Sequence, residues 1–160
     1  MKKNKTLFIT QAALIAAIYV VLVYVFKPFS FNYIQVRIAE ALTILPYFTP
    51  AAIPGVTIGC LIANILGGNI FDILFGTLAT LLGAVGSYLL RKQKYLVPVP
   101  PIVSNSIIIP WVLKYAYGFN LPVPFMMLTV GAGEIISCGV FGLVLLLVLN
   151  RYRTTIFKNQ

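Results

Sequence analysis

Apolar residues form long blocks along this chain, and short polar or proline-rich segments separate the blocks. Residues 7–26 and residues 71–90 are each predominantly apolar over about 20 residues. A helix of about that length crosses the hydrocarbon core of a bilayer. Both blocks are therefore predicted to be transmembrane helices.

The block from residue 34 to residue 66 is too long for one helix, and Pro46, Pro50 and Pro54 interrupt it. Proline lacks a backbone N–H, so it ends or kinks a helix. We expect two helices here, with a turn around Thr49–Pro50. Two further apolar blocks follow later in the chain. The predicted spans are residues 7–26, 34–48, 51–67, 71–90, 96–117 and 123–149.

The composition fits a protein whose surface faces lipid. The chain has 160 residues, of which 60% are hydrophobic and 9% are charged. Soluble domains carry roughly 25% charged residues. Six spans with short loops use the whole length, which leaves no room for a separate catalytic or nucleotide-binding domain. The prediction is a single all-α membrane domain over residues 1–160, a bundle of six transmembrane helices.

The basic residues predict the orientation of the bundle. The formal net charge is +9, and nine of the 12 basic residues gather in three clusters that flank apolar blocks. Cytoplasmic loops carry such an excess of Lys and Arg, so this pattern favours a multi-pass protein of the cell membrane over nucleic-acid binding. Both termini are then cytoplasmic, and the outer loops lie near residues 27–33, 67–70 and 117–122. The clusters are Lys2, Lys3 and Lys5; Arg91, Lys92 and Lys94; and Arg151, Arg153 and Lys158.

Several kinds of chemistry are disfavoured. The chain has no His, and Cys60 and Cys138 lie apart in apolar runs, so neither a metal site nor a Cys–His nucleophile is expected. It has no Gly-x-x-x-x-Gly-Lys-Ser/Thr phosphate loop, so it is not expected to hydrolyse ATP. We therefore expect no enzyme activity and no cofactor.

The three acidic residues are the strongest indication of a binding site. Glu40, Asp72 and Glu134 all lie within or at the edge of predicted spans. An ionisable group at such depth costs about 2.5–3.5 kcal/mol and usually lines a functional cavity. Asn64, Asn69 and Asn105 are expected at a similar depth, in the outer half of the bundle. Two simpler interpretations remain open: Arg37 and Glu40 pair with each other at i and i+3, or Asn105 only bridges helices.

The charge balance indicates the kind of ligand. Arg37 is one basic residue against three carboxylates, so a cationic or donor-rich small molecule would complete the site. A carboxylate accepts two parallel hydrogen bonds from an amidine-like edge, as in guanine or pterin. Trp111, Phe31 and Tyr33 could supply stacking faces. We expect Glu134 to contact the ligand, with Asp72, Asn69 and Asn105 beside it.

Small residues in the first span predict a packing face. Ala12 and Ala16, and likewise Ala13 and Ala17, are four residues apart near the cytoplasmic end. Small residues at this spacing let helix backbones approach closely within a membrane. The face serves either packing inside the bundle or docking of another membrane subunit.

Three runs of sequence resemble the queuosine-precursor transporter family, QueT. They are Val-Arg-Ile-Ala-Glu-Ala-Leu-Thr-Ile-Leu-Pro at 36–46, Gly-Cys-Leu-Ile-Ala-Asn at 59–64 and Asp-Ile-Leu-Phe-Gly-Thr-Leu-Ala-Thr-Leu at 72–81. Asn105 and Gly133–Glu134 also fit the family pattern. Members of this family are substrate-binding S-components of energy-coupling-factor (ECF) ABC transporters.

The resemblance implies a six-helix bundle that captures a vitamin-like solute from outside. Such a bundle docks on a transmembrane coupling subunit that carries two cytoplasmic ATPases, and only those partners use ATP. The docking face would be the alanine face of the first helix. The substrates would be 7-deazaguanines such as 7-aminomethyl-7-deazaguanine, its nitrile precursor or queuine. The guanine-like edge would take one carboxylate, and an aminomethyl cation would take a second acceptor.

Other functions remain as alternatives. The chain could be an S-component for another vitamin-like solute, or an intramembrane enzyme that uses Glu40, Asp72 or Glu134 as acid or base. A purely structural membrane protein is a third possibility, which the converging polar groups disfavour.

Overall fold

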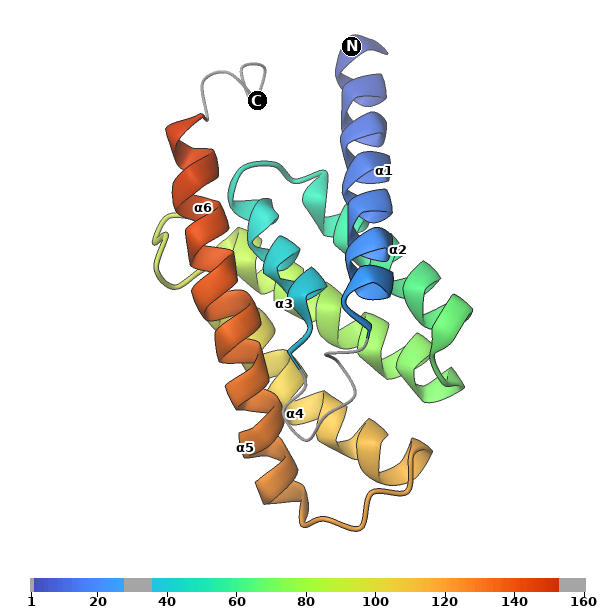
Figure 1. Ribbon diagram of the computed structural model, residues 1–160. Coiled ribbons are helices and arrows are strands. Elements are labelled where there is room, and N and C mark those ends of the chain that lie inside the picture. Colours follow the sequence, from blue (N-terminus) through green and yellow to red (C-terminus); the bar gives the residue numbers. More distant parts are fainter. Residues whose placement is uncertain (1, 28–35, 153–160) are drawn as a thin grey trace.

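The computed structural model describes residues 2–27 and 36–152, and every regular element within those ranges is helical (Figure 1). Within these ranges, three helical segments of different geometry accompany six α-helices. The α-helices are α1 (Lys2–Val25), α2 (Ala52–Gly67), α3 (Thr77–Leu89), α4 (Val99–Ala116), α5 (Val123–Glu134) and α6 (Gly142–Arg151). The other segments are the 3₁₀-helix η2 (Ile38–Tyr47) and the π-helices η3 (Asp72–Gly76) and η4 (Ile135–Phe141).

Three helical stretches are long and apolar enough to cross a membrane. They are Lys5–Val25, Asp72–Leu89 and Val123–Arg151. The π-helix η3 runs into α3, and η4 joins α5 to α6 as one continuous rod. These stretches correspond to the predicted first, fourth and sixth spans. The other predicted spans fall on the shorter apolar helices η2 and α2 and on α4, so six crossings and the orientation of the termini stay predictions.

The predicted span at 34–48 takes an unexpected form. Its described part is a ten-residue 3₁₀-helix that starts at Ile38 and contains Pro46. Nearly the whole segment is buried, because α1, α2, α3, η4 and α6 all pack around it. A helix that is apolar on all sides belongs in the interior of a bundle. A 3₁₀-helix rises about 2.0 Å per residue, so ten residues extend about 20 Å, more than an α-helix of that length. The predicted turn at Thr49–Pro50 is confirmed.

Helices α1 and α2 pack closely because two glycines of α2 face α1. A Cβ atom added to Gly59 would lie 2.7 Å from the Cβ of Tyr19 and 3.0 Å from the carbonyl oxygen of Ala16. Only a residue without a side chain permits this approach. The contact fixes Tyr19 in the interior, where it is 1% exposed.

The same contact divides the alanine face that the sequence predicts. Ala16 is buried, and a Cβ atom added to Gly55 or Gly59 would lie 3.0 Å from the backbone oxygen of Ala12 or Ala16, respectively. Ala13 and Ala17 are exposed on the outer side of α1. Ala12 and Ala16 therefore serve packing within the bundle, since α2 already covers them, and Ala13 and Ala17 are the members left for a docking face.

The two ends of the bundle differ. Helix α1 begins and α6 ends at one end, whereas the loop from residue 117 to residue 122 lies at the opposite end (Figure 1). The loop end of the molecule is the one predicted to face outward. The candidate site lies between this end and the middle of the bundle.

Candidate functional site

A cavity opens among α1, η2, α2, η3 and α4, next to the predicted outer loops. Its volume is about 130 Å³. One water molecule needs roughly 10–15 Å³ of such space, so the cavity has room for a ring-sized solute. Its walls are mostly apolar. The polar side chains that line it belong to Tyr19, Tyr24, Lys27, Arg37, Asn64, Asp72 and Tyr117.

Asp72 connects three elements at the mouth of this cavity. Its Oδ2 atom accepts hydrogen bonds from the backbone N–H of Asn69 (3.3 Å) and from the hydroxyl of Tyr117. Its carbonyl oxygen accepts a bond from Asn64 Nδ2 (2.9 Å). Burial, followed by the hydrogen bond to Asp72, raises the pKa of Tyr117 to about 12. The phenol therefore stays protonated at neutral pH and remains a donor to Asp72.

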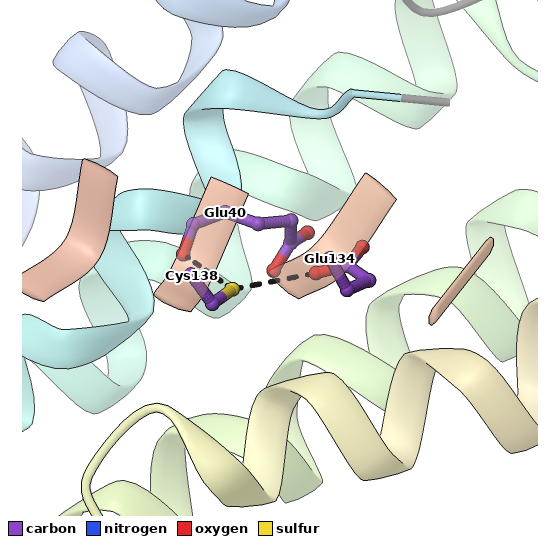
Figure 2. A group of neighbouring side chains, drawn as sticks. All are labelled: Glu40, Glu134 and Cys138. Carbon is purple, nitrogen blue, oxygen red and sulfur yellow. Dashed lines mark hydrogen bonds between the residues drawn. The ribbon is translucent and has the colours of Figure 1, made fainter. Parts of the chain in front are cut away.

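A second polar group lies deeper, where η2 meets the junction of α5 and η4. Figure 2 shows the carboxyl groups of Glu40 and Glu134 facing each other, with the thiol of Cys138 beside them. One ligating atom from each residue lies within 4.8 Å of the others, and all three residues are buried. Cys138 Sγ donates to Glu134 Oε2 at 3.3 Å and contacts the carbonyl oxygen of Glu40 at 3.3 Å.

The deep group is only partly satisfied. Glu40 Oε1 accepts bonds from the hydroxyls of Tyr19 (2.5 Å) and Thr80 (3.1 Å). Glu40 Oε2, Glu134 Oε1 and both amide atoms of Asn105 are buried without a hydrogen-bond partner among residues 2–27 and 36–152. We call these four the open atoms. More than 90% of buried polar groups in proteins have a partner, and each one without costs about 1–3 kcal/mol.

Asn105 joins the deep group from the opposite side. It projects from α4, is fully buried and lies beside Glu134 without reaching hydrogen-bond geometry. The simpler interpretation, in which Asn105 only bridges helices, remains an alternative, because the amide lies next to Glu134 across the contact between α4 and α5. The open atoms therefore come from η2, α4 and α5 and converge on one place.

The pairing of Arg37 with Glu40 is not formed. No salt bridge joins the two side chains, although their charges interact at longer range, and a backbone hydrogen bond runs from Glu40 N to Arg37 O (2.8 Å). The Glu40 carboxylate binds two hydroxyls through one oxygen, and its other oxygen is an open atom. Arg37 instead lines the cavity. The Oε2 atom of Glu40 is therefore open to a ligand, which would not be so if it formed a salt bridge with Arg37.

Tyr19 and Thr80, which the sequence did not single out, and Asn64, which it did, connect the cavity to the deep group. Tyr19 lines the cavity and donates to Glu40. Asn64 also lines the cavity and donates to Cys60 Sγ (3.4 Å), which in turn accepts from Thr80 (3.3 Å). The deep carboxylates therefore lie one layer of side chains beneath the cavity. A tyrosine hydroxyl placed 21 residues before an intramembrane acid gives no local signal of this contact.

The predicted site residues fall into two groups at different depths. Asp72 and Asn69 lie at the mouth, and the amide of Asn69 reaches the Ala116 carbonyl at 3.5 Å. Glu134 and Asn105 are each eleven residues from the ends of their helices near the outer loop, at Val123 and Ala116. At about 1.5 Å per residue that is roughly 17 Å along the helix. The expectation that Asp72 and Asn69 lie beside Glu134 does not match this arrangement.

The predicted stacking residues receive no support as lining of the cavity. Trp111 is 44% exposed on α4, where it stacks on Tyr115 with ring centroids 6.2 Å apart, and it does not line the cavity. Phe31 and Tyr33 lie outside the described residues.

Both π-helical segments accompany acidic residues of the site. The segment η3 begins at Asp72, and η4 begins directly after Glu134. A π-helix accommodates an extra residue in a helical rod and is frequent at functional sites. In η4 it brings Ser137 and Cys138 to the interior together with Glu134. The hydropathy of the sequence gives no sign of this change in helix geometry.

These features define a helical membrane protein with a cavity at one end and a partly satisfied polar site beneath it. The comparison with protein families matches residues 9–151 to the family described as QueT transporter. Because the match covers most of the chain, the protein belongs to the QueT transporter family.

One curated relative is named "Queuosine precursor transporter QueT" and comes from Lactococcus lactis subsp. cremoris (strain MG1363). It is 40% identical to this chain over 83 residues, which are 51% of this chain and 49% of the relative. The matched region thus spans about half the length of that relative. No solved structure matches.

Proposed function

We propose that this protein is the substrate-capturing membrane subunit of an ECF-type importer and that it takes up a queuosine precursor of the 7-deazaguanine class. The observation that carries the proposal is the set of open atoms beneath the cavity. Three of the four are acceptors, Glu40 Oε2, Glu134 Oε1 and Asn105 Oδ1, and they require a solute rich in hydrogen-bond donors.

A 7-deazaguanine with an aminomethyl group offers such donors at two ends, in its amidine-like ring edge and in its amine. The cavity above the open atoms has mostly apolar walls, with the hydroxyl groups of Tyr19 and Tyr117 and the charged side chains of Lys27, Arg37 and Asp72. Apolar walls with a few converging polar groups are typical of small-molecule sites. The name of the Lactococcus relative supports a precursor of queuosine over an unrelated vitamin.

The position of the cavity supports capture from outside. It lies next to Gly67, Gly68 and Phe119, in or next to loops that the distribution of basic residues predicts to be external. The solute would enter from that side and would reach the deep group by displacing the bond between Tyr19 and Glu40. Release to the cytoplasm would then require the bundle to change its conformation or its orientation.

Energy for import would come from partner subunits. The chain has no phosphate-binding loop, so we infer that it docks on a transmembrane coupling subunit with two ATPases. Ala13 and Ala17 form the exposed small-residue strip of α1 and are the proposed docking face.

We expect Ala17→Leu to abolish most ATP-dependent uptake while leaving ligand binding unchanged. Added bulk on the exposed strip prevents close helix approach, but it does not reach the cavity. The measurement is uptake of radiolabelled 7-aminomethyl-7-deazaguanine by proteoliposomes that hold this chain and the coupling module, together with co-purification of the two.

The matched control is Ala16→Leu, which adds the same bulk on the side that α2 already covers. It should destabilise the purified protein, whereas Ala17→Leu should not. Full uptake and co-purification by both Ala17→Leu and Ala13→Leu would contradict the docking face. Absence of ATP-dependent uptake by the wild-type complex would contradict the proposed function.

A further inference from the structure

We propose that Glu40 and Glu134 together form a subsite for an ammonium group, so that the site selects solutes that carry a protonated amine. The inference rests on the proposed function and makes it more specific. It assigns the charged end of the ligand to the deep group and leaves the ring to the cavity above.

The hydrogen-bond donors around the two carboxyl groups of Glu40 and Glu134 are uncharged. The two carboxyl groups face each other within 4.8 Å in a fully buried place. The side chains that bond to them in the described part of the chain are the hydroxyls of Tyr19 and Thr80 and the thiol of Cys138, all of them neutral groups. The guanidinium of Arg37 acts electrostatically on both carboxylates and offsets one of their two negative charges. The second negative charge is neutralised either by a proton or by a bound cation such as an ammonium group.

Asn105 provides an independent indication of a ligand. Its side chain is fully buried beside Glu134, and both of its amide atoms are open atoms. An ammonium group has three N–H donors and no acceptor. The open acceptors are also three: Glu40 Oε2, Glu134 Oε1 and Asn105 Oδ1. Three of the four open atoms therefore match an amine, and the fourth, the donor Asn105 Nδ2, belongs to an amide that lies beside Glu134.

A metal ion fits the same residues less well. The thiol of Cys138 is engaged as a donor to Glu134 and contacts the Glu40 carbonyl. A zinc site would need that thiol as a thiolate ligand and usually four ligands in a closed tetrahedron. An organic cation can use the two carboxylates and leave Cys138 as it is.

The test compares two ligands that differ in charge and are similar in size. They are 7-aminomethyl-7-deazaguanine and its neutral 7-hydroxymethyl analogue, each titrated against the purified full-length chain. We expect the wild type to bind the amine roughly ten- to a hundredfold more tightly, as charge-assisted hydrogen bonds would give. In Glu40→Gln this preference should shrink to within a few-fold. Asp72→Asn should change both affinities by the same factor, because Asp72 lies at the mouth.

Each outcome separates this inference from the proposed function. Equal wild-type affinities for the two ligands would overturn the ammonium subsite and leave the transporter function intact. Binding of neither ligand would refute the proposed function itself. Loss of amine binding in excess EDTA, restored by zinc, would show a metal site instead. An unaltered preference in both Glu40→Gln and Glu134→Gln, in protein that remains monodisperse, would also overturn the subsite.

Discussion

Glu134→Gln is expected to lower the affinity for 7-aminomethyl-7-deazaguanine about ten- to a hundredfold. The substitution keeps the shape of the side chain but removes its charge and one acceptor. Oε1 is the atom open to a ligand, since Oε2 accepts the bond from Cys138. Hydrogen bonds to charged groups contribute about 1.5–3 kcal/mol, which corresponds to this range of affinity. The measurement is an equilibrium titration of wild type and variant.

The stability of the empty protein provides the control for this prediction. Thermal unfolding of Glu134→Gln without ligand should occur at the same temperature as in the wild type or higher, because a buried ionisable group has been removed. Asp72→Asn should have a smaller effect on affinity, since Asp72 lies at the mouth of the cavity and its Oδ2 atom already accepts bonds from Tyr117 and Asn69. Equal affinities of Glu134→Gln and wild type would make Glu134 structural, and the site would then have to involve Glu40 and Asp72 alone.

Asn105→Leu is expected to stabilise the empty protein and to weaken ligand binding at least tenfold. Both amide atoms of Asn105 are open atoms, so the buried amide lowers the stability of the empty protein. A bound ligand that bonds to the amide would offset this cost. Replacing it with an apolar side chain of similar size removes that cost, about 1–3 kcal/mol, and also removes an acceptor for the ligand. The measurement is thermal unfolding in detergent together with the same titration.

Asn64→Leu is the matched comparison for Asn105. Asn64 is also a buried asparagine, but its amide donates to the Asp72 carbonyl and to Cys60 Sγ. Its replacement leaves these acceptors without their donor and should destabilise the protein. If Asn105→Leu destabilised the empty protein as much as Asn64→Leu, Asn105 would be a structural bridge and not part of a binding site.

The long apolar blocks were the predictable part of the fold. Residues 7–26, 71–90 and 123–149 are predicted spans because each has the length and hydropathy of a membrane-crossing helix, and the structure has corresponding helices. The 3₁₀ geometry of Ile38–Tyr47 and the two π-helical segments were not predictable. Hydropathy reports which residues avoid water, and it does not report which hydrogen bond a backbone N–H makes within a helix.

The acids of the site were predictable, but their partners were not. Glu40 and Glu134 stood out because ionisable residues are rare and costly inside apolar spans. Tyr19 and Cys138 are ordinary residues for such spans, and only the packing of α1 and η4 around η2 brings them to the acids. The separate depths of Asp72 and Glu134 could have been derived from the distance of each from its helix end.

The alanine face shows how tertiary packing selects among equivalent residues. Ala12, Ala13, Ala16 and Ala17 form two pairs with the same spacing, so the sequence cannot tell which pair faces inward. Gly55 and Gly59 of α2 determine which pair faces inward. Because these glycines have no side chains, the backbone of α1 at Ala12 and Ala16 can pack directly against them. The choice depends on contacts with residues far away along the chain.

Binding of radiolabelled 7-aminomethyl-7-deazaguanine to the purified chain, without any partner subunit, tests the proposed role most directly. The structure places a cavity and the open atoms within this one chain, so binding should be saturable without a coupling module and without ATP. Excess unlabelled ligand should displace the label, and Glu134→Gln should weaken its binding. Absence of saturable binding by folded, monodisperse protein would contradict the role of this chain as the substrate-capturing subunit.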